Sequence, residues 1–259
     1  METPSFKENH ISQIPAIQML VNLGYTYLSP AEADRQRGGK TTNVLLEDVL
    51  RKQLREINSI KVSATKTTLF TDENIERGIL ALKTLPMNQG YIATCEKAYN
   101  LLALGHALEQ TVDGDKKSFT LQYIDWKNIS NNVFHVSEEY NVMRSTSKEH
   151  YRPDLVLFVN GIPLCIVECK RPNMKEPLKQ AISQHLRNQQ EDGIRSLYVY
   201  SQLILSIATQ EAAYATNATP EKFWAKWKEK FNSDEEERNL EDKLKSFKNQ
   251  PLANSVKEQ

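Results

Sequence analysis

Two apolar runs separated by Asn160-Gly161 constrain the fold of this chain more than any other feature. Residues 152–170 read RPDLVLFVNGIPLCIVECK. An Asn-Gly pair between two apolar runs is the strongest short-range signal for a β-hairpin, because both residues tolerate the positive φ angles of a tight turn. The sequence therefore predicts two apolar strands that turn back on each other at residues 160–161.

Helix patterns precede this hairpin, and strand patterns surround it. From about residue 119 the chain consists of short runs rich in Val, Ile, Tyr and Phe, broken by Asn, Asp, Gly and Pro. A helix pattern with Pro177 near its first turn and Gly193 past its end interrupts these runs. The other predicted helices cover residues 8–23, 42–58 (with Thr41 or Thr42 as N-cap), 73–83 and 91–108, and a last one begins at Pro220.

This order of elements predicts an α/β or α+β fold in which helices flank a mixed β-sheet core. The 259 residues suffice for one large domain, or for one domain with an appendage. We predict a mainly helical part over residues 1–118, a sheet core over 119–215 and a helical extension over 216–259.

The composition excludes several classes of protein. Basic and acidic residues number 33 each, which argues against a basic nucleic-acid-binding surface over the whole molecule but leaves room for a local basic cleft. No run approaches the ~20 apolar residues of a membrane span, and the N-terminus lacks a signal-peptide pattern. Three cysteines cannot form a disulfide framework. We expect a soluble cytoplasmic protein with no membrane partner.

Three charged residues stand at the ends of the two apolar runs. Asp154 opens the first run, and Glu168 and Lys170 close the second. Any one of them alone is more simply explained as an exposed charge at a strand end. However, Glu168 and Lys170 share a strand face, and the hairpin returns Asp154 to the same end of the sheet. Two carboxylates beside an ammonium suit metal-dependent phosphodiester hydrolysis, because carboxylates hold Mg²⁺ and a lysine stabilises charge developing on the phosphate.

The register of the hairpin decides whether these side chains meet. A regular two-residue turn pairs Val159 with Ile162 and places Asp154 and Glu168 on opposite faces. A three-residue loop with Gly161 in a bulge, or another one-residue bulge, returns them to one face. We predict such a loop or bulge, because the two carboxylates cannot share a metal without it.

Pro153-Asp154 followed by Glu168-Cys169-Lys170 resembles the PD-(D/E)xK nuclease motif. The stretch IDWKNISNNVFHVSEEYNV followed by RPDLVLFVNGIPLCIVECKRP is more specific. It resembles the N-terminal nuclease region of the motor (R) subunit of type I restriction enzymes. The resemblance extends from the helix containing Glu8 to the Trp224 region. It implies a restriction-endonuclease-like sheet core in a domain over residues 1–215 that cuts double-stranded DNA.

The resemblance also implies roles for single residues. Asp154, Glu168 and the backbone carbonyl of Cys169 would hold Mg²⁺, or Mn²⁺ in its place. Lys170 would be the catalytic lysine.

Further residues follow from the same resemblance. Glu8 and Gln184 would assist the reaction. Gln184 matches the glutamine of a Gln-x-x-x-Tyr element of the family, but Asn188 stands at the tyrosine position. The predicted contacts to DNA phosphates are Arg171, Lys175, Arg187 and Asn188.

The family joins this region to an ATP-driven translocase, which we expect this chain to lack, so no ATP binding is predicted. Recognition and methylation of the DNA site would come from specificity and methyltransferase subunits of a restriction-modification complex. Gly39-Lys40-Thr41 resembles the end of a phosphate-binding loop. It lacks the first glycine and follows no strand, so we predict a loop before a helix.

Two other functions stay open at this point. One is a different PD-(D/E)xK nuclease that acts in repair or on RNA. The other is a catalytically silent module that keeps the fold in order to assemble a complex. The intact Asp154, Glu168 and Lys170 argue against a silent module, whereas Asn188 at the tyrosine position leaves room for one. Divalent-metal binding separates the silent module from the nucleases, and DNA against RNA cleavage separates the two nucleases.

Overall fold

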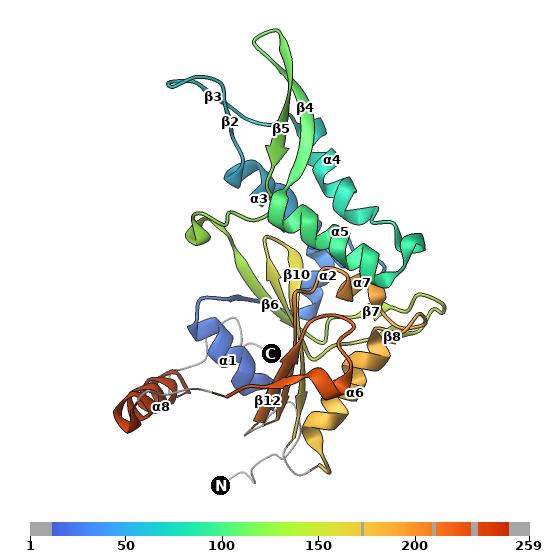
Figure 1. Ribbon diagram of the computed structural model, residues 1–259, viewed down its shortest axis with the longest axis vertical. Helices are drawn as coiled ribbons and strands as arrows, with labels where there is room; N and C mark the ends of the chain where they lie inside the picture. Colours follow the sequence, from blue (N-terminus) through green and yellow to red (C-terminus); the bar gives the residue numbers. More distant parts are fainter. Residues whose placement is uncertain (1–11, 172–173, 209–210, 229–232, 249–259) are drawn as a thin grey trace.

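The computed structural model describes residues 12–171, 174–208, 211–228 and 233–248. Its centre is a seven-stranded mixed sheet of order β1-β6-β9-β10-β11-β12-β13, flanked by helices (Figure 1). The predicted mixed α/β fold is therefore confirmed. The strands are β1 (Thr26–Leu28), β6 (Phe134–Glu138), β9 (Leu155–Val159), β10 (Ile162–Lys170), β11 (Leu203–Ala208), β12 (Glu211–Ala215) and β13 (Ala225–Lys226).

The central pair, β9 and β10, is the hairpin predicted from Asn160-Gly161. These two turn residues have φ angles of 52° and 83°. The buried Asn160 side chain accepts a hydrogen bond from the Val133 amide at 3.0 Å and donates one to the Tyr123 carbonyl at 2.9 Å. A Cβ at Gly161 would lie 2.5 Å from the Leu46 carbonyl oxygen. The turn therefore packs closely against the segment that leads into α3 (Glu47–Ile57).

Helices cover the two faces of the sheet differently. Helix α6 (Pro177–Asn188) connects β10 to the parallel strand β11 and packs against both. The opposite face carries α1 (Ile14–Asn22), whose Ile17 is buried in a cluster with residues of β6, β9 and β10. Glu168 and Lys170, at the end of β10, therefore lie in a strand that has a helix on each of its faces.

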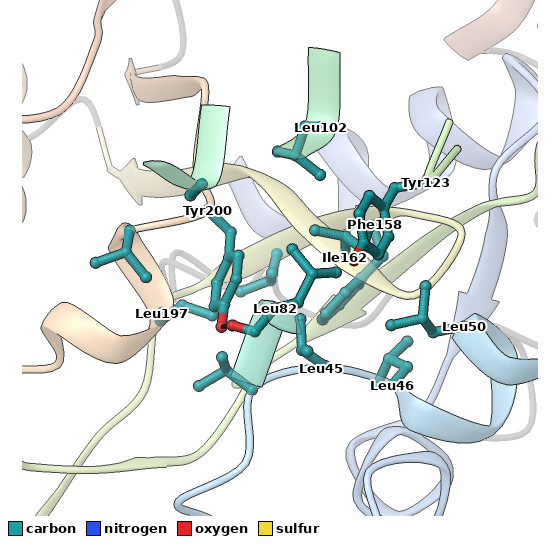
Figure 2. Packing of buried hydrophobic residues seen from close by; sticks show 14 of the residues in the cluster. Leu45, Leu46, Leu50, Leu82, Leu102, Tyr123, Phe158, Ile162, Leu197 and Tyr200 are labelled. Atoms are coloured by element: carbon teal, nitrogen blue, oxygen red, sulfur yellow. Dashed lines mark hydrogen bonds between the residues drawn. The ribbon is translucent and has the colours of Figure 1, made fainter. Parts of the chain in front are cut away.

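The remaining elements before β9 are α2 (Pro30–Gln36), β2 (Ile60–Lys61), β3 (Thr67–Thr68), α4 (Asp72–Lys83), η2 (Met87–Gln89), α5 (Tyr91–Leu104), β4 (His106–Val112), β5 (Asp115–Leu121), η3 (Ile129–Asn131), β7 (Val142–Met143) and β8 (His150–Tyr151). Most of them, α4, α5 and the hairpins β2-β3 and β4-β5, lie beyond the hairpin end of the sheet in the upper part of Figure 1, whereas α2, β7 and β8 lie beside the sheet. Their apolar side chains join those of the sheet in one continuous core, in which Leu46, Leu50 and Leu82 pack with Phe158 and Ile162 (Figure 2).

Two predicted helices have different bounds. The helix expected over residues 42–58 begins only at Glu47, because the segment before it is extended and the Leu46 amide donates to the Gly161 carbonyl at 2.9 Å. The helix expected over residues 91–108 ends at Leu104, because Gly105 (φ 81°) breaks it and β4 follows. The first helix therefore loses its first turn to a contact with the distant hairpin, and the second loses its last turn to the start of β4.

The predictions for the C-terminal third were wrong in two places. The predicted helix beginning at Pro220 is a short 3₁₀ turn, η4 (Glu221–Phe223), followed by β13, which pairs with β12. The apolar run SLYVYSQLILSI, residues 196–207, is one of those that predict a strand, but its first part belongs to helix α7 (Arg195–Tyr198) and only its second part to β11. The charged tail does form a helix, α8 (Asp234–Lys248). Within the described parts of the chain, no helix has the length and apolar character needed to cross a membrane.

Candidate active site at the ends of two central strands

A bulge in β10 sets the register between the two motif strands. The turn itself has two residues and pairs Val159 with Ile162, so the predicted three-residue loop was wrong. The predicted alternative, a one-residue bulge, is found between Pro163 and Cys165. Beyond that bulge Val167 pairs with Leu155, and the register places Asp154 next to Glu168 on the same face.

Four groups meet at this end of the sheet. The Lys170 ammonium nitrogen lies 3.7 Å from Asp154 Oδ2 and 3.9 Å from Glu168 Oε2. The same nitrogen donates a hydrogen bond to the Cys169 carbonyl oxygen at 3.1 Å. The Cys169 amide in turn donates to Asp154 Oδ2 at 2.6 Å. The structure thus brings together the residues of the PD-(D/E)xK motif, all of them largely buried.

The segment before α1 forms hydrogen bonds with the end of β10 and with the residue that precedes β9. Ser12 donates from its hydroxyl to the Lys170 carbonyl at 2.9 Å. The Gln13 amide group donates to the Asp154 carbonyl at 3.2 Å and to Glu138 Oε2 at 3.1 Å. Nothing in the local sequence pattern marks Ser12 or Gln13, because their partners lie more than 120 positions away along the chain. Glu8, the predicted accessory glutamate, lies outside the described residues.

Glu168 is the most constrained group of the site. Its side chain is 0% exposed, and neither carboxylate oxygen has a hydrogen-bond partner among the described residues. Burial and the nearby charge of Asp154 raise the pKa of Glu168 well above its ordinary value, and the Lys170 ammonium opposes this rise. On the neighbouring strand, the paired residue Ser206 is also fully buried, and its hydroxyl has no hydrogen-bond partner in the described ranges. This face of the sheet thus contains buried oxygen atoms that lack a donor.

Next to these groups lies a buried histidine that the sequence analysis did not single out. His185 is within hydrogen-bond distance of the Leu205 carbonyl through Nε2 (3.1 Å) and of the Tyr198 hydroxyl through Nδ1 (2.8 Å). Burial is the main reason why the pKa of His185 is lowered to about 4; the charge of Lys170 adds to this shift, and the hydrogen bond to the Leu205 carbonyl opposes it. The ring is therefore neutral at pH 7. Because a carbonyl only accepts, Nε2 carries the proton and Nδ1 accepts from Tyr198.

We predict that His185 makes the fold sensitive to mild acid. Between pH 6.5 and about 4 the unfolded chain binds a proton at this residue and the folded chain does not, so stability falls as the pH falls through that window. The expected loss is on the order of 3 kcal/mol. Urea unfolding at pH 7, 6, 5 and 4.5 measures it. His185→Gln should flatten the pH dependence by this amount, and parallel curves for the two proteins would contradict the prediction.

The predicted DNA-contact residues differ in exposure. Arg171, Lys175 and Arg187 are exposed, and the Arg187 guanidinium lies 5.4 Å from the centre of the Tyr151 ring. Gln184 is partly buried on α6. Asn188 is 1% exposed, and its contact with a DNA phosphate stays a prediction. Its burial follows from the close approach of the chain after α6, where the Ile194 amide donates to the Asn188 carbonyl at 2.8 Å.

The site offers few protein side chains to a metal ion. Among the described residues, no three His, Cys, Asp or Glu side chains are grouped to hold a metal ion. The site instead offers two carboxylates and the Cys169 carbonyl. An all-oxygen set with few protein ligands suits a hard cation that keeps several waters, as Mg²⁺ does. The unbonded oxygens of Glu168 agree with such a ligand.

Comparison with known protein families agrees with this geometry. The model of the type I restriction enzyme R protein N terminus matches residues 5–223. The chain belongs to this family. A relative named "Putative type I restriction enzyme MjaIXP endonuclease subunit", from Methanocaldococcus jannaschii, is 28% identical over 225 residues, which are 83% of this chain and 20% of that protein.

Two further relatives carry similar names. The type I restriction enzyme HindI endonuclease subunit of Haemophilus influenzae is 28% identical over 204 residues, 76% of this chain and 18% of that protein. The type I restriction enzyme EcoprrI endonuclease subunit of Escherichia coli is 23% identical over 219 residues, 84% of this chain and 61% of that protein. The chain thus spans about a fifth of the first two R-subunit relatives, 20% and 18% of their lengths.

Proposed function

We propose that this R-protein N-terminal chain is a Mg²⁺-dependent endonuclease domain that hydrolyses phosphodiester bonds of double-stranded DNA. The observation that carries the proposal is the convergence of Asp154, Glu168 and Lys170 through the bulge in β10. The names of the relatives support the same activity.

The residues present fit a divalent cation. Asp154, Glu168 and the Cys169 carbonyl would hold it, because the two Glu168 oxygens have no other hydrogen-bond partner in the described structure. A bound Mg²⁺ supplies positive charge that polarises the scissile phosphate and lowers the pKa of an attacking water. Mn²⁺ would substitute, since it prefers the same oxygen ligands.

The protein's own residues would orient and stabilise the reacting groups. The Lys170 ammonium is positioned to stabilise the negative charge that develops on the phosphate. The Cys169 amide fixes one oxygen of Asp154, so that the carboxylate keeps its orientation. The exposed Arg171, Lys175 and Arg187 would contact the DNA backbone and contribute no sequence specificity. Recognition of the DNA site would then come from the specificity and methyltransferase subunits of a restriction-modification complex.

The test is calorimetric titration of Mg²⁺ and Mn²⁺ into the wild type and Asp154→Asn. Asparagine keeps an oxygen that accepts the Cys169 amide, so this variant removes charge and spares the hydrogen bond. We expect binding in the wild type and at least about tenfold weaker binding in Asp154→Asn. Asp115→Asn, in an exposed residue at the start of β5, should bind like the wild type. Equal binding in all three proteins would contradict the proposed metal site and favour a silent docking module.

The substrate is tested separately. Supercoiled plasmid and a structured RNA of similar length are incubated with the chain and Mn²⁺. Cleavage of the plasmid alone supports the proposed function. Cleavage of the RNA alone would assign the chain to another branch of the nuclease superfamily.

A further inference from the structure

A cavity lies beside the segment that contacts the hairpin turn, at the other end of β10 from the candidate active site. Its volume is about 370 Å³, and its walls are the loop after α2, the start of α3, the segment after α4, and α7 with the residues that follow. It includes Leu45, whose neighbour Leu46 contacts the Gly161 turn. Asp154 and Glu168 stand at the opposite end of β10 and are not among the residues that line this cavity. The cavity is therefore separate from the nuclease site.

The floor of this cavity is apolar and rigid. It consists of the buried side chains of Val44, Leu45 and Val199 and the ring of Tyr200. The Tyr200 hydroxyl donates to the Leu82 carbonyl at 2.7 Å, which fixes the ring (Figure 2). Such a floor suits a flat apolar group of a ligand.

The rim is polar and carries a cation without a counterion. Lys83 pairs with Glu47 across the rim. The exposed Lys40 makes no ion pair within the described ranges of the chain. Arg37 lies beneath the loop at 3% exposure and is held by Asp34, so its charge is already compensated. Lys40 is therefore the charge available to a ligand.

The loop that contributes Lys40 also has unused main-chain donors. Gly38 and Gly39 have φ angles of 77° and 70°, and they turn the chain sharply after α2. The amides of residues 40, 41 and 42 donate to no acceptor in the described part of the structure. The Arg37 guanidinium anchors this loop by donating to the Asn141 carbonyl at 2.6 Å. A fixed loop with free amides and a free ammonium favours an anion.

We propose that this cavity binds a small organic phosphate of mononucleotide size. The apolar part lies on the Tyr200 floor, and the phosphate contacts Lys40 and the loop amides. The loop follows a helix and lacks the first glycine of a phosphate-binding loop, so this is not the nucleotide site of an ATPase. A DNA backbone fits less well, because its phosphates bring no apolar group that could enter the recess. The proposal does not depend on the nuclease function.

The test uses the whole chain and calorimetric titration with adenosine 5′-monophosphate, adenosine and inorganic phosphate. We expect the monophosphate to bind more tightly than either of its parts, and Lys40→Ala to weaken it about tenfold. Lys52→Ala removes a lysine that is 74% exposed on α3 and should change nothing. Thr42→Trp, at the rim, should weaken binding by filling the entrance.

Three results would overturn the proposal. The first is that adenosine binds as tightly as the monophosphate. The second is that both Lys40→Ala and Thr42→Trp bind the monophosphate as the wild type does. The third is that a short DNA duplex displaces the monophosphate and itself needs Lys40 for binding. Mn²⁺ titration of Lys40→Ala should match that of the wild type. Its outcome therefore separates a failure of this proposal from a failure of the proposed nuclease site.

Discussion

Glu168→Gln is expected to lose DNA cleavage and at the same time to make the fold more stable. The loss of activity should be roughly 10³-fold or more, because the variant removes one of two carboxylates that would hold the cation. The gain in stability follows from burial. The Glu168 side chain is 0% exposed, and its oxygens have no hydrogen-bond donor among the described residues. A neutral amide costs less to bury than a charged carboxylate, and a gain of ~1 kcal/mol is typical of such functional positions.

The raised pKa of Glu168 also predicts how the stability difference between Glu168→Gln and the wild type changes with pH. Because the pKa of Glu168 is raised, the folded metal-free chain keeps a proton that the unfolded chain has lost above pH 4.5. The contribution of Glu168 to the stability of the wild type should therefore fall as the pH rises above this value, opposite in sign to the contribution of His185 below pH 6.5. The difference in stability between Glu168→Gln and the wild type should grow as the pH rises. Urea unfolding in a chelating buffer at pH 5, 6, 7 and 8 measures this difference.

The control for this variant is Glu96→Gln, which changes an exposed glutamate on α5. It should alter neither cleavage nor stability. If Glu168→Gln were less stable than the wild type at pH 8, the attraction between Glu168 and Lys170 would outweigh the cost of burial. If it cut DNA normally, Glu168 would not hold the cation.

Lys170→Met should bind Mn²⁺ more tightly than the wild type and still fail to cut DNA. The Lys170 ammonium lies within 3.9 Å of both carboxylates and donates to the Cys169 carbonyl. These are the three groups proposed to hold the cation, so the ammonium and a divalent ion repel each other at this site. Removing the positive charge should improve Mn²⁺ affinity about tenfold, whereas the charge stabilisation needed for cleavage is lost.

The two readouts distinguish a catalytic lysine from a structural one. If Lys170 only supported the fold, its replacement would weaken metal binding and cleavage together. Calorimetry with Mn²⁺ and a plasmid cleavage assay on the same preparation decide between these outcomes. Lys179→Met, in a lysine that is 58% exposed on α6, is the matched control and should leave both measurements unchanged.

Sequence alone predicted the parts of this molecule that depend on short-range patterns. The Asn160-Gly161 turn, the two apolar strands beside it and the helix that begins at Pro177 are found where they were expected. The motif residues were also placed at the strand ends correctly. A turn, a strand alternation and a helix start are each set by residues within a few positions of one another, so their signals survive in a single sequence.

The position of the bulge in β10 was not predictable from the sequence pattern. Asp154 and Glu168 can lie on the same face only if the pairing of the two strands shifts by one residue. The sequence pattern did not show where this shift occurs. The structure places it between Pro163 and Cys165, inside the strand and not at the turn. Register of this kind depends on how the strand packs against both neighbouring strands and both helical layers.

Longer-range contacts decided the rest. Three features of the site depend on contacts between segments that no local pattern connects. They are the hydrogen bond from Gln13 to the Asp154 carbonyl, the buried neutral His185 and the burial of Asn188. The same holds for the strand that replaced the predicted helix after Pro220. The sequence by itself determined the local elements and the chemical groups available. Tertiary packing decided which of those groups meet and which are shielded from water, because register and burial are properties of contacts between distant parts of the chain.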